Sequence, residues 1–174
     1  MGVKQFNASY DKQEDRIFFR FNTQEQTEFR FWLTLFITKN MLSAIDQLIT
    51  KSLEKTHNAQ IAQVIHEFQG EAIAKSTNLK APYEGAQTYP LGEVPILVTG
   101  FSIGEKDGTF SFAFNLLGGQ SVNVQLATAA TQSMALLLRK LGAANEHWSL
   151  GSDLHVSISD SQLPENTNLN KLVH

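Results

Sequence analysis

The segment Gly100-Phe101-Ser102-Ile103-Gly104 fits the Gly-x-Ser-x-Gly pattern that carries the nucleophile of many serine hydrolases. In those enzymes a strand turns sharply into a helix, and the turn exposes the serine hydroxyl beside an oxyanion hole. Here the residues after Gly104 predict a turn and another strand, so that context is missing. An enzyme would rest on Ser102, or on a site near residues 75–94, where Tyr83 and Tyr89 could line a cleft. We keep a hydrolase that uses Ser102 as a disfavoured alternative.

Metal and phosphate motifs are incomplete in this sequence. His66-Glu67 sits on an expected helix, but Gly70 stands where a zinc-binding helix needs its second histidine. Gly118-Gly119 lacks the lysine and the following helix of a phosphate loop and predicts a hairpin turn instead. The chain has no cysteine, which excludes disulfides, thiolate nucleophiles and cysteine-ligated metals. We therefore expect no catalytic residue, no metal and no cofactor, and a protein that is not an enzyme.

The residues that best suggest binding are Phe18, Arg20, Arg30 and Trp32. Residues 17–22 and 28–33 alternate apolar and other side chains as the two strands of a hairpin do. If their phenylalanines pair on one face, the other face pairs Arg20 with Arg30 and Phe18 with Trp32. Two opposed arginines repel each other, so this face needs an explanation. Rings beside guanidinium groups form a platform for single-stranded nucleic acid or another planar anion.

A protein contact is the alternative explanation of this face, and we favour it. A helix, the C-terminal tail or a second subunit would then cover the aromatic side chains. Large exposed aromatic patches most often mark protein contacts on soluble proteins, so we expect another subunit to cover Phe18 and Trp32. The favoured function is thus a non-enzymatic binding or interaction protein that self-associates through an aromatic strand face, with single-stranded nucleic-acid binding as the alternative.

The period of the apolar residues changes after Thr34. Spacings of three and four residues follow, from Met41 to Leu53 and again from Ile61 to Phe68, which predicts helix across most of 35–74. Thr34 can cap its start. The polar segment Thr56-His57-Asn58 leaves open whether this region is one helix or two.

The chain also resembles itself. When the sequence is shifted by 93 positions, Phe19-Arg20-Phe21-Asn22 falls on Phe112-Ala113-Phe114-Asn115. In the second copy, Ala113 and Ser111 take the places of Arg20 and Phe18, so the copies differ on one strand face. We predict an α+β fold of two tandem βββα units, antiparallel meanders followed by helices, related by a pseudo-two-fold axis. The expected single domain, 1–174, divides into a first unit 3–74, a connecting loop 75–94, a second unit 95–142 and a C-terminal extension 143–174 with a flexible end.

Composition sets the remaining limits. A chain of 174 residues with 42% hydrophobic and 18% charged residues is typical of a globular protein with one shared core. Its net charge of −3 gives no general attraction to nucleic acid, so nucleic acid is not a favoured partner. No apolar run is long enough for a membrane helix, and we expect a cytoplasmic protein without membrane contact.

One stretch resembles a signature of small uncharacterised bacterial proteins: Glu14-Asp15-Arg16, Arg20-Phe21-Asn22-Thr23 and Glu28 to Thr34. The resemblance covers residues 14–34 and implies no activity. The duplicated order of strands and helix is also loosely similar to the PUR and Whirly single-stranded nucleic-acid binders. Those families have four strands in each unit, where three are expected here.

Overall fold

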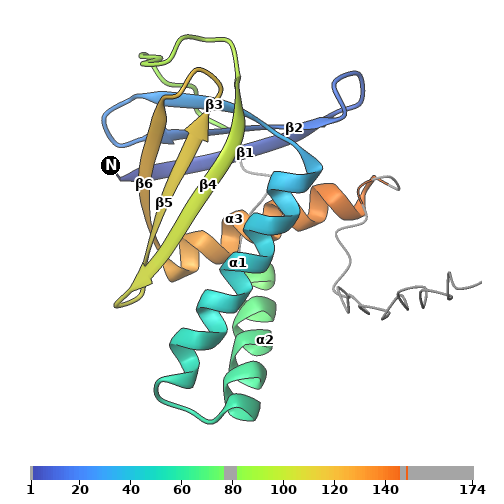
Figure 1. Cartoon of the computed structure of the whole chain (residues 1–174), viewed down its shortest axis with the longest axis vertical. Coiled ribbons are helices and arrows are strands. Elements are labelled where there is room, and N and C mark those ends of the chain that lie inside the picture. Colours follow the sequence, from blue (N-terminus) through green and yellow to red (C-terminus); the bar gives the residue numbers. More distant parts are fainter. Residues whose placement is uncertain (1, 77–81, 146–147, 149–174) are drawn as a thin grey trace, which may run out of the picture.

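The computed structural model describes residues 2–76, 82–145 and 148. These residues form a six-stranded sheet and three helices (Figure 1). In chain order the elements are β1 Val3–Asp11, β2 Arg16–Thr23, β3 Glu28–Leu33, α1 Leu35–Glu54, α2 Ala59–Ser76, β4 Ile96–Lys106, β5 Thr109–Leu116, β6 Ser121–Ala127 and α3 Thr128–Ala143. The predicted α+β class is confirmed.

The strands follow one another in the sheet in the order in which they occur in the chain. Strands β1 to β3 form one antiparallel meander and β4 to β6 form another, and the two meanders join through a short parallel pairing of β3 with β4. A parallel bridge between Gly2 and Gln125 also brings the start of the chain to β6. The first meander is followed by two helices and the second by one. The order is therefore βββαα followed by βββα, and not the two like βββα units that the sequence predicted.

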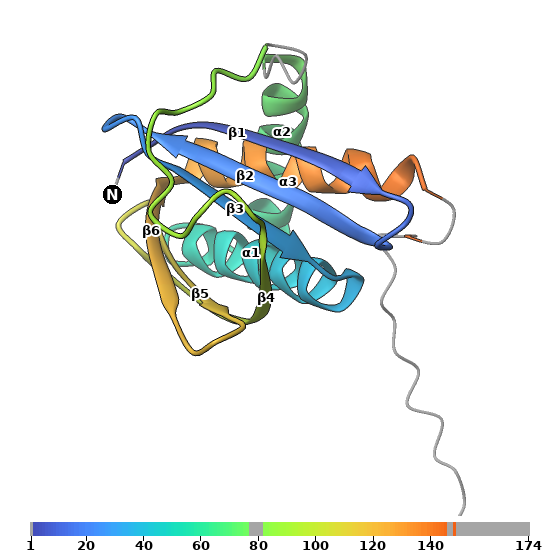
Figure 2. The ribbon, with the colours of Figure 1, turned by 90° about the horizontal axis from the view of Figure 1, so that it is seen from above.

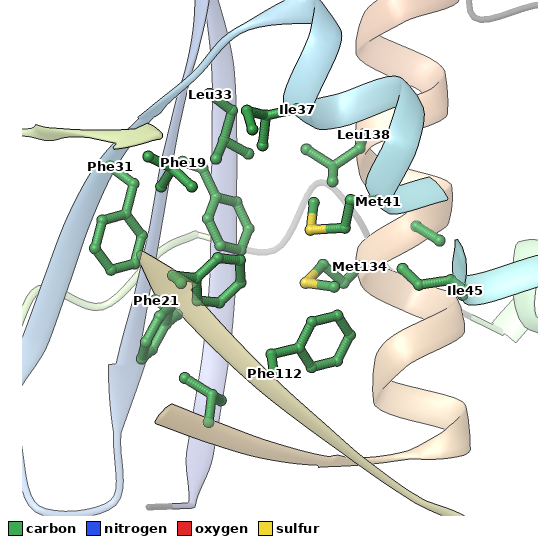
Figure 3. Close-up of a cluster of buried hydrophobic side chains, with 14 of the residues drawn as sticks. Phe19, Phe21, Phe31, Leu33, Ile37, Met41, Ile45, Phe112, Met134 and Leu138 are labelled. Carbon is green, nitrogen blue, oxygen red and sulfur yellow. The ribbon is translucent and has the colours of Figure 1, made fainter. Parts of the chain in front are cut away.

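The core lies between one face of the sheet and helices α1 and α3 (Figures 2 and 3). Phe19, Phe21 and Phe31 point from the sheet toward Met41 on α1 and Met134 on α3. All five side chains are at most 1% exposed. Burying such large side chains is the main contribution to the stability of the fold, at roughly 25 cal/mol for each Å² of apolar surface.

Polar side chains divide the helical region into two helices. The Thr34 hydroxyl accepts a hydrogen bond from the Ile37 amide at 3.3 Å and caps the start of α1, as expected. Asn58 Oδ1 accepts from the Ile61 amide at 2.9 Å and caps the start of α2. The amides of Thr56 and His57 both turn back to the carbonyl of Leu53. The question left open by the sequence is thereby answered, because a cap needs a break before it.

Helix α2 packs on α1 and α3 rather than on the sheet (Figure 1). Of its residues, all of which the structure describes, only Ala62 is buried. Its outer side exposes three large apolar side chains, Ile61, Val64 and Phe68. We call these three residues the apolar stripe on α2.

Candidate binding surface on the outer face of the sheet

The sheet has an outer face that none of the described helices covers, and the predicted side-chain pairs lie there. Phe18 is the register partner of Trp32, and Arg20 is the partner of Arg30, as expected from the alternation of the two strands. The rings of Phe18 and Trp32 meet edge to face, with centroids 5.7 Å apart. Next to Trp32 in the register is Leu97 on β4. Phe18, Trp32 and Leu97, all half-buried, form a row across three strands that we call the aromatic ridge.

A buried carboxylate explains how two arginines can lie opposite each other. Glu28 Oε1 accepts a hydrogen bond from Arg30 Nε at 2.7 Å and lies 3.8 Å from Arg20 Nη1. The Glu28 side chain is 0% exposed, so its charge acts on both guanidinium groups with little screening by water. Although burial disfavours the charged form of Arg30, the Glu28 hydrogen bond raises the pKa of Arg30 above its usual value. The repulsion expected from the sequence is therefore offset within the chain.

The connection between the two meanders covers the arginines. We call residues 82–93 the connecting strap. The Tyr83 ring lies 4.0 Å from the guanidinium carbon of Arg20, and the Tyr89 ring lies 4.5 Å from that of Arg30. Arg30 Nη1 also donates to the carbonyl oxygen of Glu93 at 2.9 Å. The arginines are thus covered by the same chain, whereas the expectation of a second subunit concerned Phe18 and Trp32.

Backbone hydrogen bonds hold the strap against the edge of this cluster. The Glu28 amide donates to the Thr88 carbonyl at 2.8 Å, and the Ala86 amide donates to Glu28 Oε2 at 3.4 Å. Asn22 Nδ2 donates to the carbonyl of Glu84 at 2.6 Å. Strap and sheet therefore form one ordered polar layer over the arginines, while the aromatic ridge beside it stays partly open to solvent.

Tyr83 is the titratable group that this layer perturbs most. Burial raises the pKa of Tyr83 far above its usual value, and the nearby negative charge of Glu28 adds to the rise. Its hydroxyl oxygen is buried and has no hydrogen-bond partner among the described residues. The raised pKa keeps the phenol protonated at neutral pH, next to the Glu28 carboxylate and the Arg20 guanidinium group.

The outer face of the second meander is hollowed where the first carries large side chains. Ser102, Ala113 and Asn123 are register partners across β4, β5 and β6, and Gly104, Ser111 and Gln125 form the next row. These six residues, together with Ile103, Phe112 and Val124, line an open hollow of about 600 Å³, which we call the polar hollow. The pairs expected from the sequence, Ala113 with Asn123 and Ser111 with Gln125, are confirmed.

Ser102 lies in the middle of strand β4 and pairs with Ala113. It is not on the sharp strand-to-helix turn that a nucleophile elbow requires, and no hydrogen bond joins it to a histidine in the described part of the chain. Three or more histidine, aspartate or glutamate side chains do not gather at a metal-binding distance anywhere among the described residues. None of the described helices is long and apolar enough to cross a membrane.

A second polar cluster, which the sequence did not reveal, joins the three helices. Asp46 on α1 accepts two hydrogen bonds from Arg139 on α3 and lies 3.7 Å from His66 Nε2 on α2. His66 Nδ1 is 3.4 Å from the hydroxyl of Thr50. Asp46, His66 and Arg139 border a cavity of about 50 Å³, which has room for only a few water molecules. We assign this cluster a structural role in holding α2.

Comparison with protein-family models, curated proteins and solved structures found no match for this chain. The resemblance of residues 14–34 to small bacterial proteins therefore stays an expectation, and the function must be argued from the geometry alone.

Proposed function

We propose that this chain is a non-enzymatic binding protein that self-associates through the aromatic ridge. The observation that carries the proposal is the contrast between neighbours on one face. The strap of the same chain covers Arg20 and Arg30, whereas Phe18 and Trp32 contact each other and keep part of their rings in water. Aromatic side chains that pack rigidly and stay accessible are the usual anchors of protein interfaces.

The geometry favours a protein partner over single-stranded nucleic acid. A nucleic-acid platform needs arginines free to meet phosphates and rings free to stack on bases. Here two tyrosines occupy the faces of the guanidinium groups, and Glu28 supplies the anion that a phosphate would otherwise provide. Titration of a labelled oligonucleotide at low salt tests the alternative, because phosphate contacts would give a strongly salt-dependent affinity.

We also propose that the two meanders with α1 and α3 are diverged copies related by an approximate two-fold axis. Two contacts support this. The parallel contact of β3 with β4 has a counterpart in the parallel bridge between Gly2 and Gln125. At the 93-residue offset, Gln125 corresponds to Trp32 on β3, and Gly2 corresponds to Pro95, which directly precedes β4. Asp46 and Arg139, which contact each other, are also 93 residues apart. A two-fold axis brings equivalent residues together in this way.

Replacement of both ridge rings tests the proposed function. In Phe18→Ser/Trp32→Ser, we expect self-association to weaken at least tenfold, because two aromatic anchors leave the interface. The matched control is Val64→Ser/Phe68→Ser, which makes similar changes in the apolar stripe on α2 and should leave the association unchanged. Sedimentation velocity over a range of protein concentrations measures the mass of each variant.

A fold reporter is available in the ridge variant itself. Trp148 is 1% exposed, and its indole N–H donates to Asp15 Oδ1 at 2.8 Å, so its fluorescence reports native packing after Trp32 is removed. Wild-type protein that stays monomeric at every concentration would contradict the proposal. So would a ridge variant that keeps both its native fluorescence and the wild-type mass.

A further inference from the structure

We propose that the polar hollow of one copy receives the aromatic ridge of a second copy, so that the chains associate head to tail. This inference rests on the proposed self-association and names the surface that the ridge meets. Ridge and hollow occupy equivalent positions of the two meanders, because Phe18 corresponds to Ser111 and Trp32 to Gln125 at the 93-residue offset. The same strand positions thus carry aromatic side chains on the first meander and small or polar side chains on the second.

The hollow has the shape that a pair of rings needs. Its middle strand, β5, contributes the small side chains of Ser111 and Ala113, and Gly104 on β4 contributes none. Asn123 and Gln125 on β6 form one wall. The hollow, of about 600 Å³, is broad and open to solvent, so side chains of a second chain can reach its floor.

The hydrogen-bonding groups of the two surfaces also complement each other. The indole N–H of Trp32 is a donor that forms no hydrogen bond with any described residue, and the ridge itself offers no side-chain acceptor. In the hollow, the side chains of Asn123 and Gln125 present carbonyl oxygens that likewise have no partner within the described residues. No charged side chain lines the hollow, so aromatic rings can enter it without the cost of burying an unpaired charge.

Ridge-to-ridge pairing is the competing arrangement, and it fits less well. In that arrangement the two Trp32 N–H donors would find no acceptor in the opposite ridge. It would also place the Arg20 and Arg30 clusters of both copies beside each other. The hollow avoids both problems because it offers side-chain acceptors and is neutral.

The expected interface is small. Phe18 and Trp32 are already half-buried within the chain, so the two rings supply only a minor part of the ~800 Å² that each partner buries in a standard interface. The connecting strap and the rim of the hollow would contribute the rest. We expect reversible association, with a mass that rises with concentration beyond that of a dimer, because a head-to-tail contact leaves one free surface of each kind at every step.

A complementation experiment distinguishes the two arrangements. Ser111→Phe fills the hollow with the residue that the first copy carries at the equivalent position, and Phe18→Ser/Trp32→Ser removes the ridge. Neither variant should associate with itself, but an equimolar mixture should form a one-to-one complex of dimer mass and stop there. Thr109→Phe, on the same strand and face but outside the hollow, is the matched control and should associate like the wild type. Far-ultraviolet circular dichroism confirms that each variant is folded, and Trp148 fluorescence does so for the variant that lacks Trp32.

The outcomes separate this inference from the function on which it rests. If Ser111→Phe associates like the wild type while the ridge variant does not, the ridge is an interface and the hollow is not its partner. If both variants lose association and their mixture does not recover it, head-to-tail pairing is also excluded. If wild type is monomeric at every concentration, self-association itself fails. Recovery in the mixture, with loss in each variant alone, supports the inference.

Discussion

Arg139 on α3 donates through Nη2 to both carboxylate oxygens of Asp46 on α1, at 2.7 and 2.6 Å, and the two residues lie 93 positions apart, the offset at which the sequence resembles itself. Helices α1 and α3 pack on each other, and each contributes a methionine to the shared core. These residues, Met41 and Met134, are also 93 positions apart. Under the proposed duplication, the Asp46–Arg139 pair marks the contact between the two copies, where an acid faces a base.

The Asp46–Arg139 pair should contribute modestly to stability. Both side chains are about two-fifths exposed, and exposed ion pairs are typically worth about 0.2–1 kcal/mol. We expect a double-mutant cycle of Asp46→Asn and Arg139→Gln, followed by urea unfolding, to give a coupling in this range that falls as salt is added. A coupling of zero at low salt would show that the pair does not stabilise the contact of α1 with α3.

Glu28 should matter more than any exposed ion pair of the described chain. Its carboxylate is fully buried and faces two guanidinium groups, so Glu28→Gln keeps the shape of the side chain and removes its charge. We expect a loss of about 2 kcal/mol in the free energy of unfolding, below the 3–5 kcal/mol typical of a broken buried pair because the arginines are partly exposed.

The matched control for Glu28 is Glu84→Gln, because Glu84 forms an exposed ion pair with Lys4. Its replacement should change the free energy of unfolding by less than about 0.5 kcal/mol. Equal effects of the two substitutions would mean that Glu28 does not organise the arginine cluster.

The strand faces could be predicted from the sequence because alternation leaves little freedom. Once Phe19 and Phe21 are assigned to the core, a period of two places Phe18 and Arg20 on the other face. The short turns then fix the register, which is why the Phe18–Trp32 and Arg20–Arg30 pairs are found where they were expected. Glu28 could have been found by the same reasoning, since it lies two residues before Arg30 and so shares its face.

The cover of the arginines could not be predicted. Tyr83 and Tyr89 meet Arg20 and Arg30 across about sixty residues of chain, and the segment between positions 75 and 94 has no period that fixes its path. Such contacts depend on the three-dimensional course of a loop rather than on local pattern. The sequence also predicted a C-terminal extension, 143–174, with a flexible end. Most of this extension, residues 146–147 and 149–174, lies outside the described residues.

The buried phenol of Tyr83 should make stability depend on alkaline pH. Its pKa is raised in the folded protein, first by burial and then by the charge of Glu28, so the folded state binds this proton more tightly than the unfolded state does. The resulting stability is fully present below the unfolded pKa of about 10 and is lost as the pH rises above it.

Tyr83→Phe removes the proton and a hydroxyl that lacks a partner among the described residues. We therefore expect this variant to match or exceed the wild type at pH 8, and to lose less stability than the wild type between about pH 9.5 and 11. Urea midpoints at each pH, with Tyr89→Phe as control, measure the difference. Parallel pH curves for wild type and Tyr83→Phe would show that the Tyr83 hydroxyl is not the group that titrates.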